Sequence, residues 1–135
     1  MYSVLVVDDE PAITFILRML LEEEGFQVET ASSAQEAIEI LGHKKFDGVV
    51  TDIRMETPSA GFDVVRAAKA LIHPPVVVIM TAFPVLPQVW KSTGADDLMV
   101  KGNDQRSVAG VLKQLLALRE GASEAPVRKK KVVNE

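Results

Sequence analysis

The sequence predicts an α/β fold in which parallel strands form one central sheet and helices cover both of its faces. Short runs rich in Val and Ile alternate along the chain with longer segments that have helical periodicity. Three of these runs are apolar almost throughout, which is typical of parallel strands buried on both faces. The chain has 135 residues, 47% of them hydrophobic and 25% charged, so it can form one domain with a substantial core.

Five strands are expected, each a short run of β-branched residues between polar or turn-forming residues. The first, third and fourth runs are the continuously apolar ones. The second alternates between polar and apolar residues, which predicts a half-covered strand at an edge of the sheet. The five runs cover residues 3–7, 27–30, 48–51, 76–80 and 97–100.

The first two predicted helices have clear ends. Apolar residues three and four positions apart mark one helix over residues 13–21, and Gly25 stops it. The same spacing marks a second helix over residues 34–41. Ser32 or Ser33 is in the right place to cap its start, and Gly42 to end it.

Three more helical segments follow. Residues 64–72 and 108–116 carry apolar stripes, and Asn103 or Asp104 is expected to cap the second of these. The segment between them, residues 85–93, is short. Pro84 precedes it and Pro87 lies within it, so only a weak helix is expected there. Strands and helices that alternate in this way imply right-handed crossovers and a parallel sheet.

Charge is unevenly distributed along the chain. The net charge is −4, but residues 119–135 contain five basic and three acidic side chains, so the remainder is acidic. The last segment is also rich in small and polar residues. We therefore predict one domain over residues 1–118, followed by a charged tail or the start of a linker over residues 119–135.

Composition excludes several classes of function. An acidic body argues against direct binding of nucleic acid, which needs a basic face. The chain has no cysteine, so disulfides and thiol catalysis are excluded. It shows neither a signal peptide nor a long apolar run, which predicts a cytoplasmic protein without a membrane span. Phosphate-binding glycine motifs of nucleotide enzymes are also absent from the sequence.

The residues that follow the predicted strands are the candidate site. Ligands of open α/β sheets bind beyond the carboxyl ends of the strands. Asp8 and Asp9 follow the first strand, Asp52 the third, Thr81 the fourth and Lys101 the fifth. Each has an ordinary structural explanation when taken alone, such as a helix cap or a solvated charge. Their joint occurrence at four strand ends predicts one functional crevice.

The chemistry of these side chains indicates phosphoryl transfer. Three crowded carboxylates repel one another unless a cation lies among them. Oxygen ligands favour Mg²⁺, ahead of Mn²⁺ or Ca²⁺. A lysine and a threonine beside such a site can contact phosphoryl oxygens. The set therefore predicts an aspartate that accepts a phosphoryl group with the help of Mg²⁺.

Four segments of the chain resemble one known family, the receiver domain of bacterial two-component response regulators. They are VLVVDDEP, TDIRM, MTA and GADDLMVK, in this order, within residues 1–118. The resemblance implies a flavodoxin-like (βα)₅ fold with strand order 2-1-3-4-5. It also implies a phosphorylation-controlled switch in a phosphorelay, which assists only its own phosphorylation and dephosphorylation and is not an enzyme for a separate substrate.

The resemblance assigns roles to individual residues. Asp52 would accept the phosphoryl group from the phosphohistidine of a sensor histidine kinase or phosphotransfer protein. Asp9 and Asp52 would bind Mg²⁺ directly, together with the backbone carbonyl of Arg54, while Asp8 would act mostly through water. The resemblance leaves open the downstream effector, and whether the protein is a monomer or a phosphorylation-dependent dimer.

The sequence departs from the family pattern around the switch residues. Thr81 and Lys101 would contact the phosphoryl oxygens, but Gly102 stands where the family usually has a proline in a cis peptide bond. Leu98 replaces the usual aromatic switch residue, and the loop after the phosphoacceptor has one extra residue. Signal transmission through an aromatic ring is therefore not expected.

Two alternatives follow from these observations. The first is a pseudo-receiver, an interaction module that keeps the fold without using phosphorylation; Gly102 and Leu98 favour it, whereas the complete set of site residues opposes it. The second is a Mg²⁺-dependent aspartyl-phosphate phosphatase. That chemistry places a second aspartate two residues after the nucleophile, where this chain has Arg54.

Overall fold

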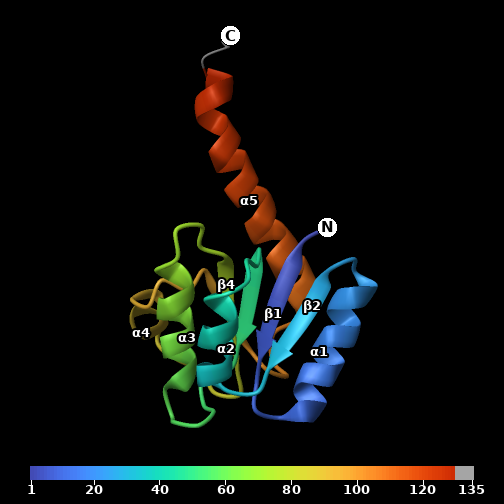
Figure 1. The fold of residues 1–135 in the computed structure, drawn as a ribbon, viewed down its shortest axis with the longest axis vertical. Helices are drawn as coiled ribbons and strands as arrows, with labels where there is room; N and C mark the ends of the chain where they lie inside the picture. Colours follow the sequence, from blue (N-terminus) through green and yellow to red (C-terminus); the bar gives the residue numbers. More distant parts are fainter. Residues whose placement is uncertain (130–135) are drawn as a thin grey trace.

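The computed structural model describes the backbone of residues 1–129 and the side chains of residues 1–121. Its centre is a five-stranded parallel sheet with the order β2-β1-β3-β4-β5, as in the flavodoxin-like fold (Figure 1). Three strands have the predicted bounds, and β2 and β4 each extend one residue further. The strands are β1 (Ser3–Val7), β2 (Gln27–Ala31), β3 (Gly48–Thr51), β4 (Val76–Thr81) and β5 (Asp97–Val100).

Five helices connect and follow the strands, and they cover both faces of the sheet (Figure 1). Apolar residues of α2 and α3 join one core cluster, together with Trp90 of α4, and those of α1 and α5 join the other. In the part of the chain that the structure describes, no helix is both long and apolar enough to cross a bilayer. The helices are α1 (Pro11–Glu23), α2 (Ala34–Leu41), α3 (Ala60–Lys69), α4 (Pro87–Lys91) and α5 (Val108–Lys129).

Successive side chains of a strand point to opposite faces of the sheet, and this explains the continuously apolar sequence of β1. Leu5 and Val7 of β1 belong to the cluster under α2 and α3. Val4 and Val6 of the same strand belong to the cluster under α1 and α5. All four side chains are buried. A strand that contributes side chains to two cores must be apolar on both faces, so this pattern is typical of an interior strand such as β1.

The start of α5 differs from the prediction, because Ser107 and not Asn103 or Asp104 caps the helix. The amide of Gly110 donates a hydrogen bond to Oγ of Ser107 at 2.9 Å. The amides of Asn103 and Asp104 instead turn back to the carbonyl of Val100, at 3.1 and 3.2 Å. This turn continues β5 into a loop and delays the helix. Of the two serines predicted to cap α2, Ser33 is the cap, since its Oγ accepts from an α2 amide at 3.0 Å.

Helices α4 and α5 deviate in opposite directions from their predicted lengths. Helix α4 is a single turn of five residues. Helix α5 has 22 residues and continues without a break beyond residue 118, where the small polar residues do not predict a helix. Arg119 contacts Asp47, and the Tyr2 hydroxyl donates to Glu120, so two contacts hold this extension to the domain. Residues 130–135 of the predicted tail lie outside the described residues.

The last part of the fold that positions the site is the close approach of α3 to the end of β3. Gly61 lies in the first turn of α3, and its amide donates to the carbonyl of Ile53 at 2.8 Å. A Cβ atom at this position would lie only 1.9 Å from the carbonyl oxygen of Asp52. The absence of a side chain therefore lets the helix rest directly on the backbone that follows β3.

We expect Gly61→Ala to destabilise the protein by about 1–3 kcal/mol, because the methyl group overlaps the Asp52 backbone and forces it to move. Urea unfolding measures this loss. Gly121→Ala is the control: the position is also in a helix, with open space around it. That control should be neutral or slightly stabilising, by up to about 1 kcal/mol. Equal stability of Gly61→Ala and wild type would contradict the close approach.

Candidate functional site

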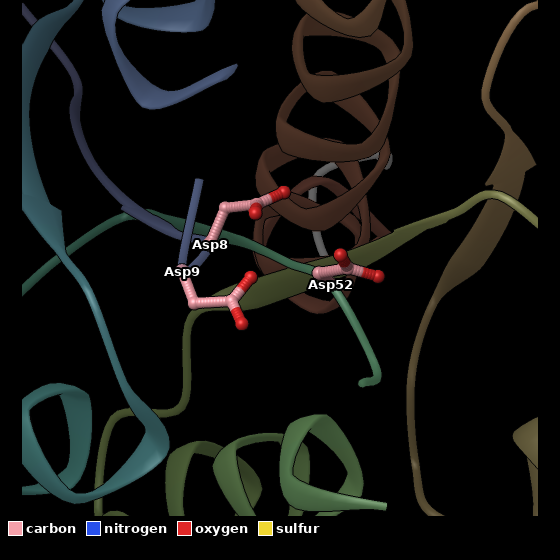
Figure 2. Close-up of side chains that lie close together, drawn as sticks. All are labelled: Asp8, Asp9 and Asp52. Carbon is pink, nitrogen blue, oxygen red and sulfur yellow. The ribbon is translucent and has the colours of Figure 1, made fainter. Parts of the chain in front are cut away.

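The structure brings together the three carboxylates that follow β1 and β3. One carboxylate oxygen from each of Asp8, Asp9 and Asp52 lies within 4.8 Å of the other two, and Figure 2 shows the three side chains. Asp8 is buried, with 3% of its surface exposed, whereas Asp9 is exposed and Asp52 is intermediate. The two strands are direct neighbours in the sheet, which is why their ends converge.

Backbone groups hold the first carboxylate in place. The amide of Asp8 donates to the carbonyl of Ala31 at 3.1 Å, which extends the pairing of β1 with β2. Oδ1 of Asp8 accepts from the amide of Glu10 at 3.0 Å. The other oxygen of this carboxylate, Oδ2, accepts from Nζ of Lys101 at 3.0 Å.

Asp52 is held in a similar way at the end of β3. Its amide donates to the carbonyl of Val7 at 3.0 Å and continues the ladder between β1 and β3. Its Oδ1 accepts from the amide of Ile53 at 2.7 Å, so the orientation of the carboxylate follows the backbone of the next residue. Oδ2 faces Lys101.

Lys101 supplies the positive charge of the site. Its Nζ donates to Oδ2 of Asp8 and to Oδ2 of Asp52, each at 3.0 Å. The amide of Lys101 donates to the carbonyl of Thr81 at 2.7 Å, so β4 fixes the root of the side chain. Partial burial by itself lowers the pKa of the ammonium group, but the two hydrogen-bonded carboxylates outweigh it and raise the pKa above its usual value. Lys101 is therefore charged at physiological pH.

The donor set fits a hard divalent cation. The three carboxylates are clustered and Lys101 pairs with two of them, Asp8 and Asp52, which leaves excess negative charge at the carboxyl edge of the sheet. Carboxylates bind metals through oxygen. Mg²⁺ and Mn²⁺ prefer oxygen ligands, whereas softer metals prefer sulfur or nitrogen. Asp8, Asp9 and Asp52 are thus chemically suited to the predicted metal site.

Thr81 lies beside this group, at the end of the neighbouring strand. It is buried, and its Oγ accepts from the amide of Phe83 at 3.3 Å. Thr81 also lines a cavity of about 210 Å³ together with Ile53 and Arg54, the two residues after the central aspartate. The guanidinium carbon of Arg54 lies 5.0 Å from the centre of the Phe83 ring. The loops after β3 and β4 are thus in contact.

The residues that depart from the family pattern have ordinary structural roles here. Gly102 adopts a φ of +81°, a backbone conformation that favours glycine, and every peptide bond among the described residues is trans. Leu98 is half-buried and packs on the cluster under α2 and α3. The loop after Lys101 therefore turns through a glycine, without a proline.

Two charged residues near the site escaped prediction from the sequence. Arg106 bridges Asp97 and Asp104 across the loop that follows Lys101. Hydrogen bonds from Arg106 lower the pKa of the Asp104 carboxyl to about 2. Glu56, in the loop after β3, accepts hydrogen bonds from the start of α2. The extra residue in that loop was the single signal in the sequence that pointed toward Glu56.

Comparison with known proteins identifies the family. The family described as the response regulator receiver domain matches residues 4–120. The transcriptional regulatory protein ZraR of Escherichia coli K12 is 34% identical over 117 residues, which cover 85% of this chain and 26% of ZraR. AlgB of Pseudomonas putida, an alginate biosynthesis transcriptional regulatory protein, is 36% identical over 95% of this chain and 30% of its own length. The chain spans less than a third of either relative.

Solved structures agree with this assignment. The response regulator TrrA of Thermotoga maritima, in complex with Mg²⁺ and BeF, is 30% identical with a TM-score of 0.75, and covers 85% of this chain and 99% of its own. A CheY-like receiver domain protein of Methanospirillum hungatei is 26% identical with a TM-score of 0.82, and covers 90% of this chain and 98% of its own. The sequence match over residues 4–120, the strand order and the acidic site lead to one conclusion: this chain belongs to the response regulator receiver domain family.

Proposed function

We propose that this receiver domain is a phosphorylation-controlled switch in which Asp52 accepts the phosphoryl group. The observation that carries the proposal is the position of the Lys101 ammonium, which is shared between Asp8 and Asp52 beside the third carboxylate. An ammonium in this place can neutralise phosphoryl oxygens as they approach Asp52. The donor would be the phosphohistidine of a sensor histidine kinase or of a phosphotransfer protein.

The carboxylates of Asp8, Asp9 and Asp52 would hold Mg²⁺, or Mn²⁺ in its place, with the backbone carbonyl of Arg54 as a further ligand. The donor chemistry and spacing of the carboxylates support this assignment. The ion supplies charge neutralisation for the phosphoryl group when it is bound. Asp8 is already fixed by two hydrogen bonds, which suits a role in orienting the ion, directly or through water.

The chemical step is a displacement at phosphorus. A carboxylate oxygen of Asp52 forms a bond to phosphorus, while the bond from phosphorus to the histidine ring nitrogen breaks and its electron pair stays on the ring. Lys101 moves from its two carboxylates toward a phosphoryl oxygen. The Thr81 hydroxyl, at the end of the next strand, would donate to another.

The same step can alter the surface of the domain through Thr81. In the present structure the Thr81 hydroxyl oxygen accepts a hydrogen bond from the amide of Phe83. Rotation of Thr81 toward a phosphoryl group removes this bond and releases the loop before α4. Phosphorylation then shifts an equilibrium between two arrangements of the loop and the single-turn helix.

A pseudo-receiver that never uses phosphorylation is the second candidate. Gly102 and Leu98 favour it, because both stand where the family pattern has residues used in switching. The hydrogen-bonded geometry of Lys101 supports the phosphorylated switch instead. Catalysis on a separate phosphoester substrate is not proposed, since the Arg54 side chain lies over the Phe83 ring and offers no general acid.

Output depends on a partner that the chain does not identify. The relatives are transcriptional regulators of which this chain spans only part, so we propose that a separate effector domain or protein receives the signal. We propose a cytoplasmic location and no direct nucleic-acid binding by residues 1–118, in keeping with their acidic charge. Either a monomer or a phosphorylation-dependent dimer is compatible with this function.

Acetyl phosphate with Mg²⁺ should add one phosphoryl group to the wild-type protein, and Asp52→Asn should abolish the addition, because an amide cannot form the acyl phosphate. Intact-protein mass spectrometry measures both. Asp63→Asn is the matched control, since Asp63 is an exposed carboxylate paired with Arg66 on α3. Labelling of Asp52→Asn at the wild-type level would refute the assignment, and an unlabelled wild type would favour the pseudo-receiver.

Mg²⁺ should stabilise the fold, because it relieves repulsion among Asp8, Asp9 and Asp52. One site at 100 times its dissociation constant contributes about 2.7 kcal/mol. The thermal midpoint should rise with Mg²⁺ in the wild type and in the Asp63→Ala control, and much less in Asp9→Ala. An equal rise in all three proteins would indicate nonspecific screening in place of a metal site.

Beryllofluoride with Mg²⁺, which stands in for the phosphoryl group, should change amide hydrogen exchange mainly across residues 81–93. The reason is that the bond between the Phe83 amide and Thr81 breaks, whereas Leu98 has no ring to reposition. Asp52→Asn serves as the unliganded control. Were the largest change to centre on residues 97–100, the signal would pass through β5 and the proposed route would be wrong.

A further inference from the structure

Glu56 fastens the loop after the phosphoacceptor strand to the start of a different helix. Its Oε1 accepts from the amide of Ala34 at 2.9 Å, and its Oε2 accepts from the amide of Gln35 at 3.0 Å. Both amides belong to the first turn of α2, where backbone donors have no partner within the helix. A carboxylate at a helix start is also favoured by the helix dipole. The contact is therefore a specific two-point attachment.

This attachment closes a ring of contacts around the acidic residues. On one side, the amide of Asp8 is bonded to the carbonyl of Ala31, three residues before Ala34. On the other side, Asp52 is bonded to the carbonyl of Val7, the residue before Asp8. Glu56, four residues after Asp52, completes the ring by joining the loop after β3 to the start of α2. The backbones that carry the three carboxylates in Figure 2 are thus joined both through the sheet and through Glu56.

The loop backbone also controls the orientation of the central carboxylate. Oδ1 of Asp52 accepts from the amide of Ile53 at 2.7 Å, so a shift of the loop turns the carboxylate with it. Arg54, whose carbonyl is the further ligand proposed above, lies between Ile53 and Glu56. Groups that orient metal ligands commonly change metal affinity by about 10–100-fold when they are removed, because the ion depends on small changes in ligand position.

We propose that Glu56 is a positioning residue for the Mg²⁺ site, which holds the loop after β3 in the arrangement that lets Asp8, Asp9 and Asp52 bind one ion together. This inference rests on the function proposed above. Glu56 does not touch the ion in this scheme. Its two hydrogen bonds to α2 fix the loop, and the loop fixes Asp52 and the carbonyl of Arg54.

Glu36 offers a control matched in charge and location. Its Oε1 accepts from the amide of Ser32 at 2.7 Å and from the Ser32 hydroxyl at 3.0 Å. Glu36 is thus another carboxylate at the start of α2 that binds local backbone. Unlike Glu56, it belongs to α2 itself and does not connect that helix to the loop after Asp52.

The test is titration of Mg²⁺ into the full chain by calorimetry, with urea unfolding in EDTA to record the stability of each variant. Glu56→Ala should weaken Mg²⁺ binding about tenfold. Glu56→Gln should fall between Glu56→Ala and wild type, because its amide oxygen can replace one of the two acceptors. Glu36→Gln should bind as the wild type does, although it loses the same charge as Glu56→Gln.

The outcomes are distinct. Wild-type affinity in Glu56→Ala would overturn the inference and leave the proposed function intact. Equal weakening in Glu56→Gln and Glu36→Gln would assign the effect to lost charge and overturn the positioning role. If Glu56→Ala folds too weakly to be titrated, the difference between these two glutamine variants decides. A wild type that binds no Mg²⁺ would overturn the proposed metal site and this inference together.

Discussion

Repulsion among three carboxylates at one edge of the sheet is the constraint on which the site depends. Asp8, Asp9 and Asp52 lie close enough to bind one ion, so without a positive charge each destabilises the others. The Lys101 ammonium reduces this repulsion, because it donates hydrogen bonds to two of the three carboxylates at once. The site is therefore pre-formed, yet it retains excess negative charge. That residual charge would favour binding of the divalent cation proposed for this site.

The fold keeps this unfavourable group together by means of backbone pairing. The amides of Asp8, Asp52 and Lys101 all extend strand ladders, to Ala31, Val7 and Thr81 respectively. The backbone of each of these charged residues is therefore held by strand pairing, directly after a strand. Burial of the apolar strands stabilises the fold, and part of this stabilisation offsets the electrostatic cost at the strand ends.

The sheet and most of the site could be predicted because both follow from local patterns. Five apolar runs set the strands, and parallel strands place the polar residues that end them at one edge. Ser107, Glu56 and Arg106 could not be found in this way. Their roles depend on where a loop turns back and on which distant amides and carboxylates it meets. The extension of α5 escaped prediction for the same reason, since Asp47 and Tyr2, far away in sequence, hold Arg119 and Glu120.

That extension gives the domain a helical arm. Helix α5 leaves at the end of the sheet opposite the acidic residues, and Arg119 meets Asp47 at the point of departure (Figure 1). From there to Lys129 the helix advances about 15 Å at its usual rise per residue. A rod pivoting on such a point converts rotation into displacement: a tilt of about 10° moves its tip by about 3 Å. Any small change in how α5 sits on the sheet is thus magnified with distance from the domain.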